Sequence, residues 1–236
     1  MTSVIRNERY APDFLFRPGA YFLSGTDTDV GKTFVGCLLA QEATRRGLRV
    51  GAYKPVASGF PSITGSDGER LWIATDRVGS LDQVSPQRFA APLAPELAAA
   101  TEGKTIDEQA IFEGFCEMQP QCDLLLVEGA GGLYSPVSPT LCNADLAKRW
   151  KLPVVLVANW KLGVVHQTLS CLHAARATDN SIAAIILSET SPQPQLSLLE
   201  NRNFLVRSLE RFYRESPPPI YSVRFGATMW NESSSP

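Results

Sequence analysis

The sequence predicts a single α/β domain in which a mostly parallel β-sheet carries helices on both faces. Three observations favour this class. Short apolar runs alternate with helix-compatible segments along the chain. A length of 236 residues with 44% hydrophobic residues suffices for a sizeable core, and a loop rich in Gly, Thr and Asp joins the first apolar run to a helix. We expect the domain to span residues 19–230, between an N-terminal arm (1–18) and a C-terminal tail (231–236).

The regular structure is expected to begin with a strand and a helix on either side of this loop. The run Tyr21-Phe22-Leu23 predicts the strand, and apolar side chains at helical spacing predict the helix, namely Phe34, Val35, Leu38, Leu39 and Ala43. The helix should end near Arg46-Gly47, because basic residues and glycine are typical of helix C-termini. Residues 48–53 are then expected to form the second strand, which completes a βαβ unit.

The middle of the chain alternates loops with helices. Pro, Ser, Gly and Asp predict a loop over residues 60–68, and two prolines make residues 89–95 irregular. Helices are expected over residues 69–78, 96–100 and 106–118.

Apolar runs without alternation indicate buried parallel strands in the second half. Residues 123–127 form the first such run, and it delivers the sequence EGAGG (128–132) at its end. Further strands are expected over residues 152–158, 182–187 and 220–224. Helices should cover residues 164–177 and 197–213.

The loop GTDTDVGKT (residues 25–33) has the chemistry of a phosphate cradle. A polyphosphate needs converging backbone N–H groups, a helix N-terminus, a lysine, and a hydroxyl beside Mg²⁺. Gly31, Lys32 and Thr33 supply these features and stand in the order that is usual for such a loop. The first glycine of the common pattern would fall at Thr26, and Gly25 stands one residue earlier. An ordinary surface turn is the alternative, but the strand before and the helix after favour a phosphate-binding loop and a P-loop NTPase-like fold.

The composition excludes several kinds of partner and of reactive site. A net charge of −2 gives no overall attraction to nucleic acid or anionic membrane. Five scattered cysteines indicate neither a disulfide framework nor a zinc site, and two histidines leave little room for a histidine-based centre. Because no long apolar span or leader is apparent, we expect a cytoplasmic protein. Because histidines are few, we expect carboxylates and lysines to be the reactive side chains.

Three oxygen ligands and two lysines are candidates for that chemistry. Thr33, Asp67 and Glu128 suit Mg²⁺, which takes few protein oxygens and completes its shell with phosphates and water. A lone Asp in a Gly-rich loop is also typical of a turn. Lys32 and Lys54 would face one crevice if their strands are neighbours in the sheet, and their charges would then stabilise phosphoryl transfer.

Four segments together resemble the dethiobiotin synthetase family: GTDTDVGKT (25–33), YKPVASG (53–59), VEGAGG (127–132) and LPVVLVANWKLG (152–163). The resemblance implies an enzyme of biotin biosynthesis that converts 7,8-diaminononanoate, CO₂ or bicarbonate, and ATP into dethiobiotin, ADP and phosphate with Mg²⁺. It also implies a homodimer whose substrate site is completed across the interface. No nucleic acid or membrane partner is expected.

The resemblance assigns roles to particular residues. Lys54 and Lys32 are implied to be catalytic, and Thr33, Asp67 and Glu128 to hold the metal. Nucleotide binding is implied for Asp29, Val30, Gly31, Lys32, Thr33, Phe34, Asp67, Glu128, Gly129, Ala130, Gly131, Ser188 and Glu189. Substrate binding is implied for Thr28, Lys54, Ser58, Leu162 and Gly163.

The chain departs from the family pattern where the base is read. The family's usual Asn-Asp pair after the last long strand is replaced here by Ser188-Glu189. A serine hydroxyl makes a single hydrogen bond and lacks the paired amide edge that Asn presents to adenine.

Two alternatives have different functions. A P-loop ATPase switch of the partitioning or site-placement type would have the same fold, but its signature lysine would fall at Asp27. A non-catalytic nucleotide-binding relative is compatible with the altered base-reading residues. The presence of Lys32, Lys54, Asp67 and Glu128 argues against it.

Overall fold

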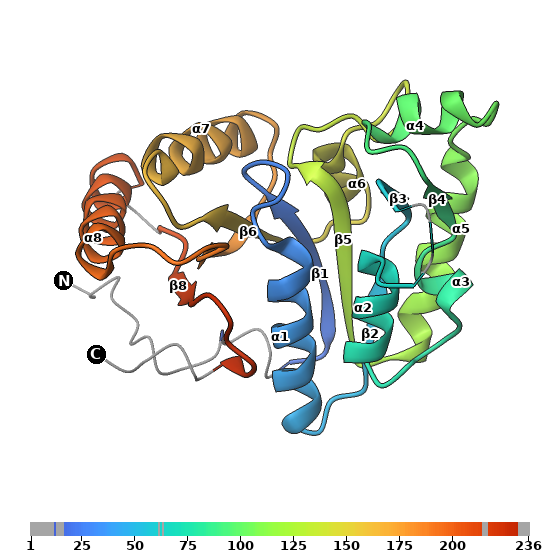
Figure 1. Cartoon of the computed structure of the whole chain (residues 1–236), viewed down its shortest axis with the longest axis horizontal. Helices are drawn as coiled ribbons and strands as arrows, with labels where there is room; N and C mark the ends of the chain where they lie inside the picture. Colours follow the sequence, from blue (N-terminus) through green and yellow to red (C-terminus); the bar gives the residue numbers. More distant parts are fainter. Residues whose placement is uncertain (1–11, 13–16, 61, 63, 214–216, 231–236) are drawn as a thin grey trace.

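The computed structural model describes residues 12, 17–60, 62, 64–213 and 217–230. The expected arm therefore lies largely, and the expected tail wholly, outside the described residues. The described chain forms a six-stranded sheet with the order β2-β5-β1-β6-β7-β8, in which each neighbouring pair is parallel (Figure 1). Its strands are β1 (Gly19–Gly25), β2 (Val50–Tyr53), β5 (Leu124–Gly132), β6 (Val154–Asn159), β7 (Ile182–Ser188) and β8 (Ile220–Val223). The predicted parallel sheet is confirmed.

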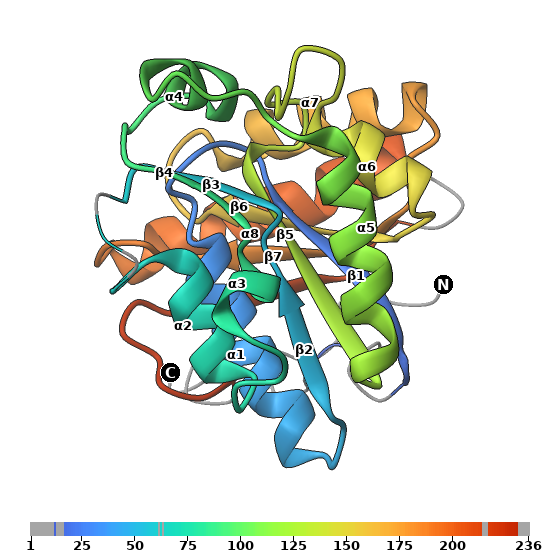
Figure 2. The same ribbon diagram turned by 90° about the vertical axis from the view of Figure 1, so that its right-hand side faces the viewer.

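Helices cover both faces of this sheet, as predicted. The helices are α1 (Lys32–Arg45), α2 (Asp67–Ala74), α3 (Leu81–Val84), α4 (Pro95–Thr101), α5 (Glu108–Met118), α6 (Asn143–Arg149), α7 (Val164–Ala177) and α8 (Gln195–Phe212), with a 3₁₀ turn at Gln119–Gln121. Figure 2 shows the sheet between α1 and α2 on one side and α5 and α6 on the other. No helix in the part of the chain that the structure describes is long and apolar enough to cross a membrane.

Strand β5, which lies between β2 and β1, is buried on both faces, and this explains its unbroken apolar run. Leu124 and Leu126 belong to the core formed with α1, whereas Leu125 and Val127 belong to the core formed with α5. Successive side chains of a strand point to opposite faces, so a strand covered on both sides needs an apolar residue at each position. The same parity points the side chain of Glu128 toward α1.

The expected helices and strands are largely confirmed, with shifted ends. The expected helix over 69–78 is α2, which starts two residues earlier because the Ser66 hydroxyl accepts a hydrogen bond from Glu69 N and caps it. The strand expected over 123–127 continues to Gly132, so EGAGG belongs to β5 and does not follow it. A register shift against β1 lies within this segment.

The order of the strands and a second sheet were not predicted. β1, α1 and β2 form the expected βαβ unit, but β5 lies between its two strands. A second, two-stranded parallel sheet of β3 (Val56–Ser58) and β4 (Gln87–Phe89) was not predicted, and Phe89 lies in β4 rather than in an irregular stretch. The short helices α3 and α6 were also missed. Three residues of strand, or four to seven of helix, are too few to show a clear periodicity.

Candidate functional site

The predicted phosphate-binding loop lies at the carboxyl end of β1 and leads into α1. Asp29 has φ 54° and Gly31 has φ 90°, so the chain turns sharply before the helix. No side chain caps the N-terminus of α1, which leaves its first N–H groups directed at the loop. Lys32 Nζ donates to the carbonyl of Asp27 at 3.2 Å across the loop. The loop thus combines free N–H groups, a helix dipole and a lysine, which together attract an anion.

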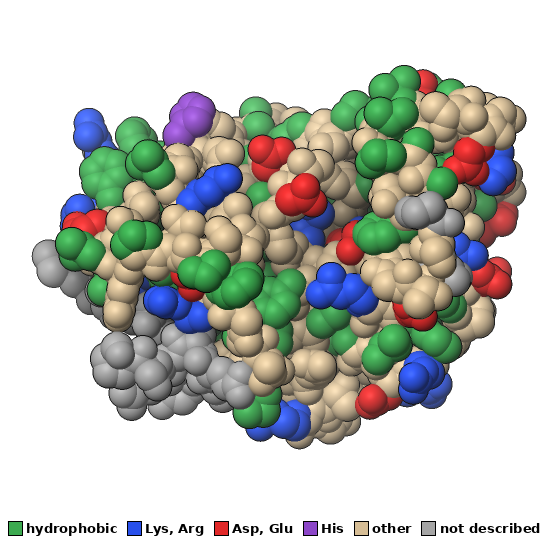
Figure 3. All heavy atoms as spheres, viewed as in Figure 1, with side chains coloured by type: hydrophobic (Ala, Val, Ile, Leu, Met, Phe, Trp, Pro, Cys, Tyr) green, Lys and Arg blue, Asp and Glu red, His purple; other side chains and the backbone are tan. Residues whose placement is uncertain are grey.

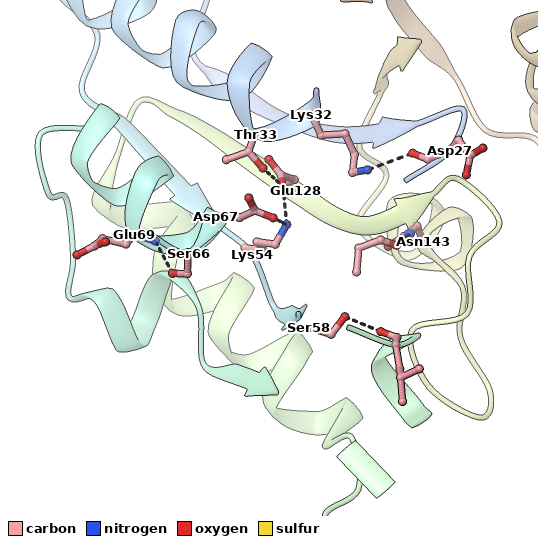
Figure 4. Close-up of polar contacts among 12 residues, drawn as sticks. Asp27, Lys32, Thr33, Lys54, Ser58, Ser66, Asp67, Glu69, Glu128 and Asn143 are labelled. Atoms are coloured by element: carbon pink, nitrogen blue, oxygen red, sulfur yellow. Dashed lines mark hydrogen bonds and ion pairs between the residues drawn. The ribbon is translucent and has the colours of Figure 1, made fainter. Parts of the chain in front are cut away.

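A cluster of four side chains lies directly beside this loop (Figure 4). Thr33 Oγ1 donates to Glu128 Oε1 at 2.8 Å. Lys54 Nζ lies 2.5 Å from the same oxygen and 3.0 Å from Asp67 Oδ2. These residues come from α1, β5, the end of β2 and the start of α2, which meet at the carboxyl edge of the sheet.

Within the cluster, attraction between Lys54 and its carboxylate neighbours opposes the effect of burial on the pKa values of Lys54 and Asp67. Burial would lower the pKa of Lys54, but the charges of Glu128 and Asp67 outweigh burial and raise it. Burial would likewise raise the pKa of Asp67, and the neighbouring Lys54 ammonium lowers it instead. Burial dominates at Lys32 and lowers the pKa of that ammonium. Two cations and two carboxylates therefore share a site that is largely withdrawn from water.

The donor set fits a hard divalent cation. Glu128 Oε2 is buried and has no hydrogen-bond partner among the described residues, although a buried carboxylate oxygen normally has one. Thr33 and Asp67 add two further oxygens next to the phosphate-binding loop. A small set of protein oxygens beside a phosphate site is the arrangement in which Mg²⁺ is usually bound.

A cavity of about 450 Å³ opens beside the loop, and the last residues of the loop form part of its lining. Figure 3 views this face, where acidic and basic side chains meet in a hollow near the middle. The cavity is lined by Asp29, Gly31, Lys32, Thr33, Phe34, Asp67, Arg70, Ser188, Glu189, Thr190, Phe225 and Gly226. Its size is that of an ordinary small-molecule pocket.

Several expected site residues do not line this cavity. Glu128 and Lys54 lie behind it in the buried cluster, at 1% and 3% exposure. Thr28 is exposed on the loop, and a Cβ on Gly131 would be 3.6 Å from its methyl group. The Ser58 hydroxyl donates to the carbonyl of Leu93.

Two further substrate candidates and three nucleotide candidates also lie outside the lining of the cavity. Leu162 is 88% exposed, and Gly163 precedes α7 with φ 96°. Val30 is buried beneath the loop. Gly129 and Ala130 belong to β5 and do not line the cavity.

Sequence reasoning missed residues that support or line the site. Asn143 is fully buried at the start of α6 and donates from Nδ2 to the carbonyls of Ala130 and Gly132, at 2.7 Å each. It thereby holds the glycine-rich end of β5. Arg70, Thr190 and Phe225 line the cavity. Arg70 follows Asp67 by one helical turn, which was an available signal. Phe225 directly follows the strand predicted over residues 220–224, and ligands bind at the carboxyl ends of parallel strands.

A parallel sheet with a phosphate-binding loop after β1, and a lysine-carboxylate cluster beside that loop, define a P-loop nucleotide-binding protein. Residues 19–214 match the protein family described as an AAA domain. The chain belongs to the dethiobiotin synthetase family. It is 41% identical over 181 residues to the ATP-dependent dethiobiotin synthetase BioD of Caulobacter sp. (strain K31), covering 75% of this chain and 79% of that protein.

The chain is also similar to another curated protein and to a solved structure. The chain is 38% identical over 206 residues to the ATP-dependent dethiobiotin synthetase BioD of Rhodopirellula baltica, covering 79% of each chain. Among solved structures, it is similar to the signal recognition particle receptor FtsY from Elizabethkingia anophelis with a TM-score of 0.49 and 15% identity, covering 98% of this chain and 65% of that chain.

Proposed function

We propose that this protein is an ATP- and Mg²⁺-dependent dethiobiotin synthetase, a ligase of biotin biosynthesis that forms C–N bonds. Its substrates would be 7,8-diaminononanoate, CO₂ and ATP, and its products dethiobiotin, ADP and phosphate. The observation that carries the proposal is the buried Lys54, held between Glu128 and Asp67 beside the phosphate-binding loop. The names of the similar proteins support the same activity.

The reaction has three steps, and negative charge must be stabilised on the carbamate and on the transferring phosphoryl group. One amine of the substrate attacks CO₂ and loses a proton, which gives a carbamate. A carbamate oxygen then attacks the γ-phosphorus of ATP and releases ADP. The second amine attacks the carbonyl of this mixed anhydride and expels phosphate, which closes the cyclic urea. Negative charge develops on carbamate and phosphoryl oxygens, so fixed ammonium groups nearby lower the barrier.

The residues of the cluster divide this work. Lys32 and the N–H groups at the start of α1 would hold the β- and γ-phosphates. Lys54 would stabilise the carbamate and the transferring phosphoryl group, and its two carboxylate neighbours keep it protonated. Thr33, Asp67 and Glu128 would hold Mg²⁺, which neutralises charge on the phosphate oxygens when bound.

Substrate contacts and the assembly are further parts of the proposal. Thr28 and Ser58 would contact the diamine or its carbamate. Leu162 and Gly163 would complete the site of a second subunit in a homodimer, and the 88% exposure of Leu162 leaves that side chain free to do so. The protein would act in the cytoplasm, as the domain of residues 19–230.

Incubation of the pure protein with 7,8-diaminononanoate, bicarbonate, Mg²⁺ and ATP tests the proposal. We expect dethiobiotin by mass spectrometry and one ADP released for each product. Reactions without the diamine should release no ADP above background. If no ring-closed product forms under conditions in which an established dethiobiotin synthetase is active, the proposed activity is wrong.

A further inference from the structure

The cavity beside the phosphate-binding loop has two chemically different walls. One wall carries four charged residues on the loop, α1 and α2, namely Asp29, Lys32, Asp67 and Arg70. The opposite wall consists of residues 188–190 and 225–226, at the carboxyl ends of β7 and β8. If the phosphates occupy the charged wall, as the proposed function requires, the base of the nucleotide has the opposite wall as its neighbour.

Ser188 offers this wall one hydroxyl. The side chain is fully buried at the end of β7, and its Oγ has no hydrogen-bond partner among the described residues. It lies against the loop, because a Cβ on Gly31 would be 2.5 Å from Ser188 Oγ. A hydroxyl can donate or accept, so it bonds equally well to a carbonyl, an amino group or a ring nitrogen. It therefore does not distinguish one base from another.

Glu189 is the one charged side chain of this wall, and its carboxylate is already engaged. Oε1 accepts from Gln193 N at 2.8 Å, and Oε2 accepts from Phe225 N at 3.1 Å. Arg224 Nε lies 2.9 Å from the same Oε2. The side chain is 4% exposed. Glu189 thus fixes the turn after β8 and acts as a positioning residue for Phe225.

Phe225 gives this wall its largest exposed surface. The side chain lines the cavity and remains 55% exposed, although a phenyl ring usually avoids water. Thr190 turns its methyl group toward Gly31, at 3.5 Å from a Cβ built there. An aromatic ring stacks on the flat face of any nucleobase, and such stacking tolerates changes of base.

We infer that Phe225 is the platform on which the nucleobase stacks, and that this site selects its nucleotide by the triphosphate and hardly by the base. Ser188 adds one hydrogen bond without preference, and Glu189 holds the platform in place. Purine and pyrimidine nucleoside triphosphates are therefore all ligands of this site. The inference rests on the proposed nucleotide site and adds the determinant of base selection.

Equilibrium binding with the full chain and Mg²⁺, in the absence of the diamine, tests this inference. The ligands are ATP, GTP, CTP and UTP, with inorganic tripolyphosphate as a probe that lacks a base. The four nucleotides should bind with Kd values within about tenfold of one another. Phe225→Ala should weaken all four about 5- to 150-fold, the range found for loss of one stacking contact, and leave tripolyphosphate unchanged.

Matched variants separate stacking from general damage. Phe225→Trp keeps an aromatic face and should retain binding. Phe204→Ala removes an equally exposed ring, also at 55%, from the distant helix α8 and should change nothing. Glu189→Ala should weaken the nucleotides and spare tripolyphosphate, and Glu189→Gln, which keeps one carbonyl acceptor, should recover part of the loss.

Two results would overturn the inference while leaving the proposed function intact. One is a preference above tenfold for ATP in the wild-type protein. The other is a Phe225→Ala variant that binds nucleotides as well as Phe204→Ala does. If neither nucleotides nor tripolyphosphate bind the wild-type protein, the nucleotide site itself is wrong, and the proposed function fails with the inference.

Discussion

Lys54 and Glu128 form a buried ion pair, with Nζ 2.5 Å from Oε1 and both side chains at 4% exposure or less. Residues 74 positions apart meet because β2 and β5 are neighbours in the sheet. A buried charge without its partner is costly, so replacing either residue leaves the other as an uncompensated buried charge. Stability and the proposed catalysis therefore depend on the same contact.

Replacement of Lys54 should cost both activity and stability. We expect Lys54→Met to lower kcat at least about 100-fold, because a fixed charge at the reacting oxygens is lost. The buried pair predicts a loss of roughly 3–5 kcal/mol in the free energy of unfolding, measured by urea denaturation.

A double variant shows whether that loss comes from the orphaned carboxylate. Lys54→Met combined with Glu128→Gln leaves only the partly exposed Asp67 carboxylate without its ammonium partner, and should be more stable than Lys54→Met alone. It should remain inactive. Equal stability of the single and double variants would contradict the coupling of the two residues.

Removal of the Glu128 carboxylate should impair metal binding. In the presence of nucleotide, we expect Glu128→Gln to weaken Mn²⁺ binding at least about tenfold, since an amide is a poorer ligand than a carboxylate for a hard cation. Electron paramagnetic resonance of free Mn²⁺ measures this directly. Glu102→Gln neutralises a carboxylate paired with Lys104 away from the cluster and should bind Mn²⁺ normally.

Gly31 and Gly47 have nearly the same φ, so alanine variants at the two positions separate backbone strain from a steric clash of the added Cβ. Gly31 has φ 90° and Gly47 has φ 89°, so alanine at either position should cost about 1–2 kcal/mol. Only at Gly31 would the added Cβ meet another atom, Ser188 Oγ at 2.5 Å, whereas Gly47 has nothing within 4 Å. Gly31→Ala should therefore also abolish nucleotide binding, measured by calorimetry. Unchanged nucleotide affinity in Gly31→Ala would contradict the close approach of these residues.

Asn143 should stabilise the glycine-rich end of β5. Asn143→Ala removes two hydrogen bonds to backbone carbonyls, although that of Gly132 still accepts from Ser135 N, and should reduce the free energy of unfolding by about 1–3 kcal/mol. Thermal and urea unfolding followed by circular dichroism measure the loss. Asn180→Ala removes a buried amide whose one side-chain hydrogen bond among the described residues goes to the Thr178 hydroxyl, and it should cost less. An equal or smaller effect of Asn143→Ala would exclude this role.

Cys37 should resist alkylation at alkaline pH. Burial, together with the charge of Glu128, raises the pKa of its thiol to about 12, against about 8.5 for an ordinary cysteine. Iodoacetamide at pH 9 should modify the exposed Cys116 and spare Cys37, as peptide mass spectrometry would show. Rapid modification of Cys37 in the native protein would contradict the raised pKa.

The same raised pKa predicts a pH dependence of stability. Between about pH 8.5 and 12 the thiol ionises in the unfolded chain and stays protonated in the fold. The free energy of unfolding should therefore be unaffected below pH 8.5 and fall as the pH rises toward 12. Cys37→Ser should reduce the slope of this decline, and an unchanged slope would exclude Cys37 as its source.

Sequence periodicity predicted many of the helices and strands. The unbroken apolar run of β5 and the helical spacing of α1 are local patterns, and their positions were predicted to within a few residues. The loop before α1 was recognised because its chemistry is contained in nine consecutive residues. Short elements such as β3 and α3 were missed, because their stability comes from packing against distant segments.

By itself, the sequence determined the phosphate-binding loop, the alternation of strands and helices, and the family. Only the tertiary structure decided that β5 lies between β1 and β2, which places Glu128 between Thr33 and Lys54. It also decided that Phe225, more than 190 residues after the loop, lines the same cavity. The physical reason is that side-chain periodicity is set by each residue's near neighbours, whereas strand order depends on which faces can be buried together.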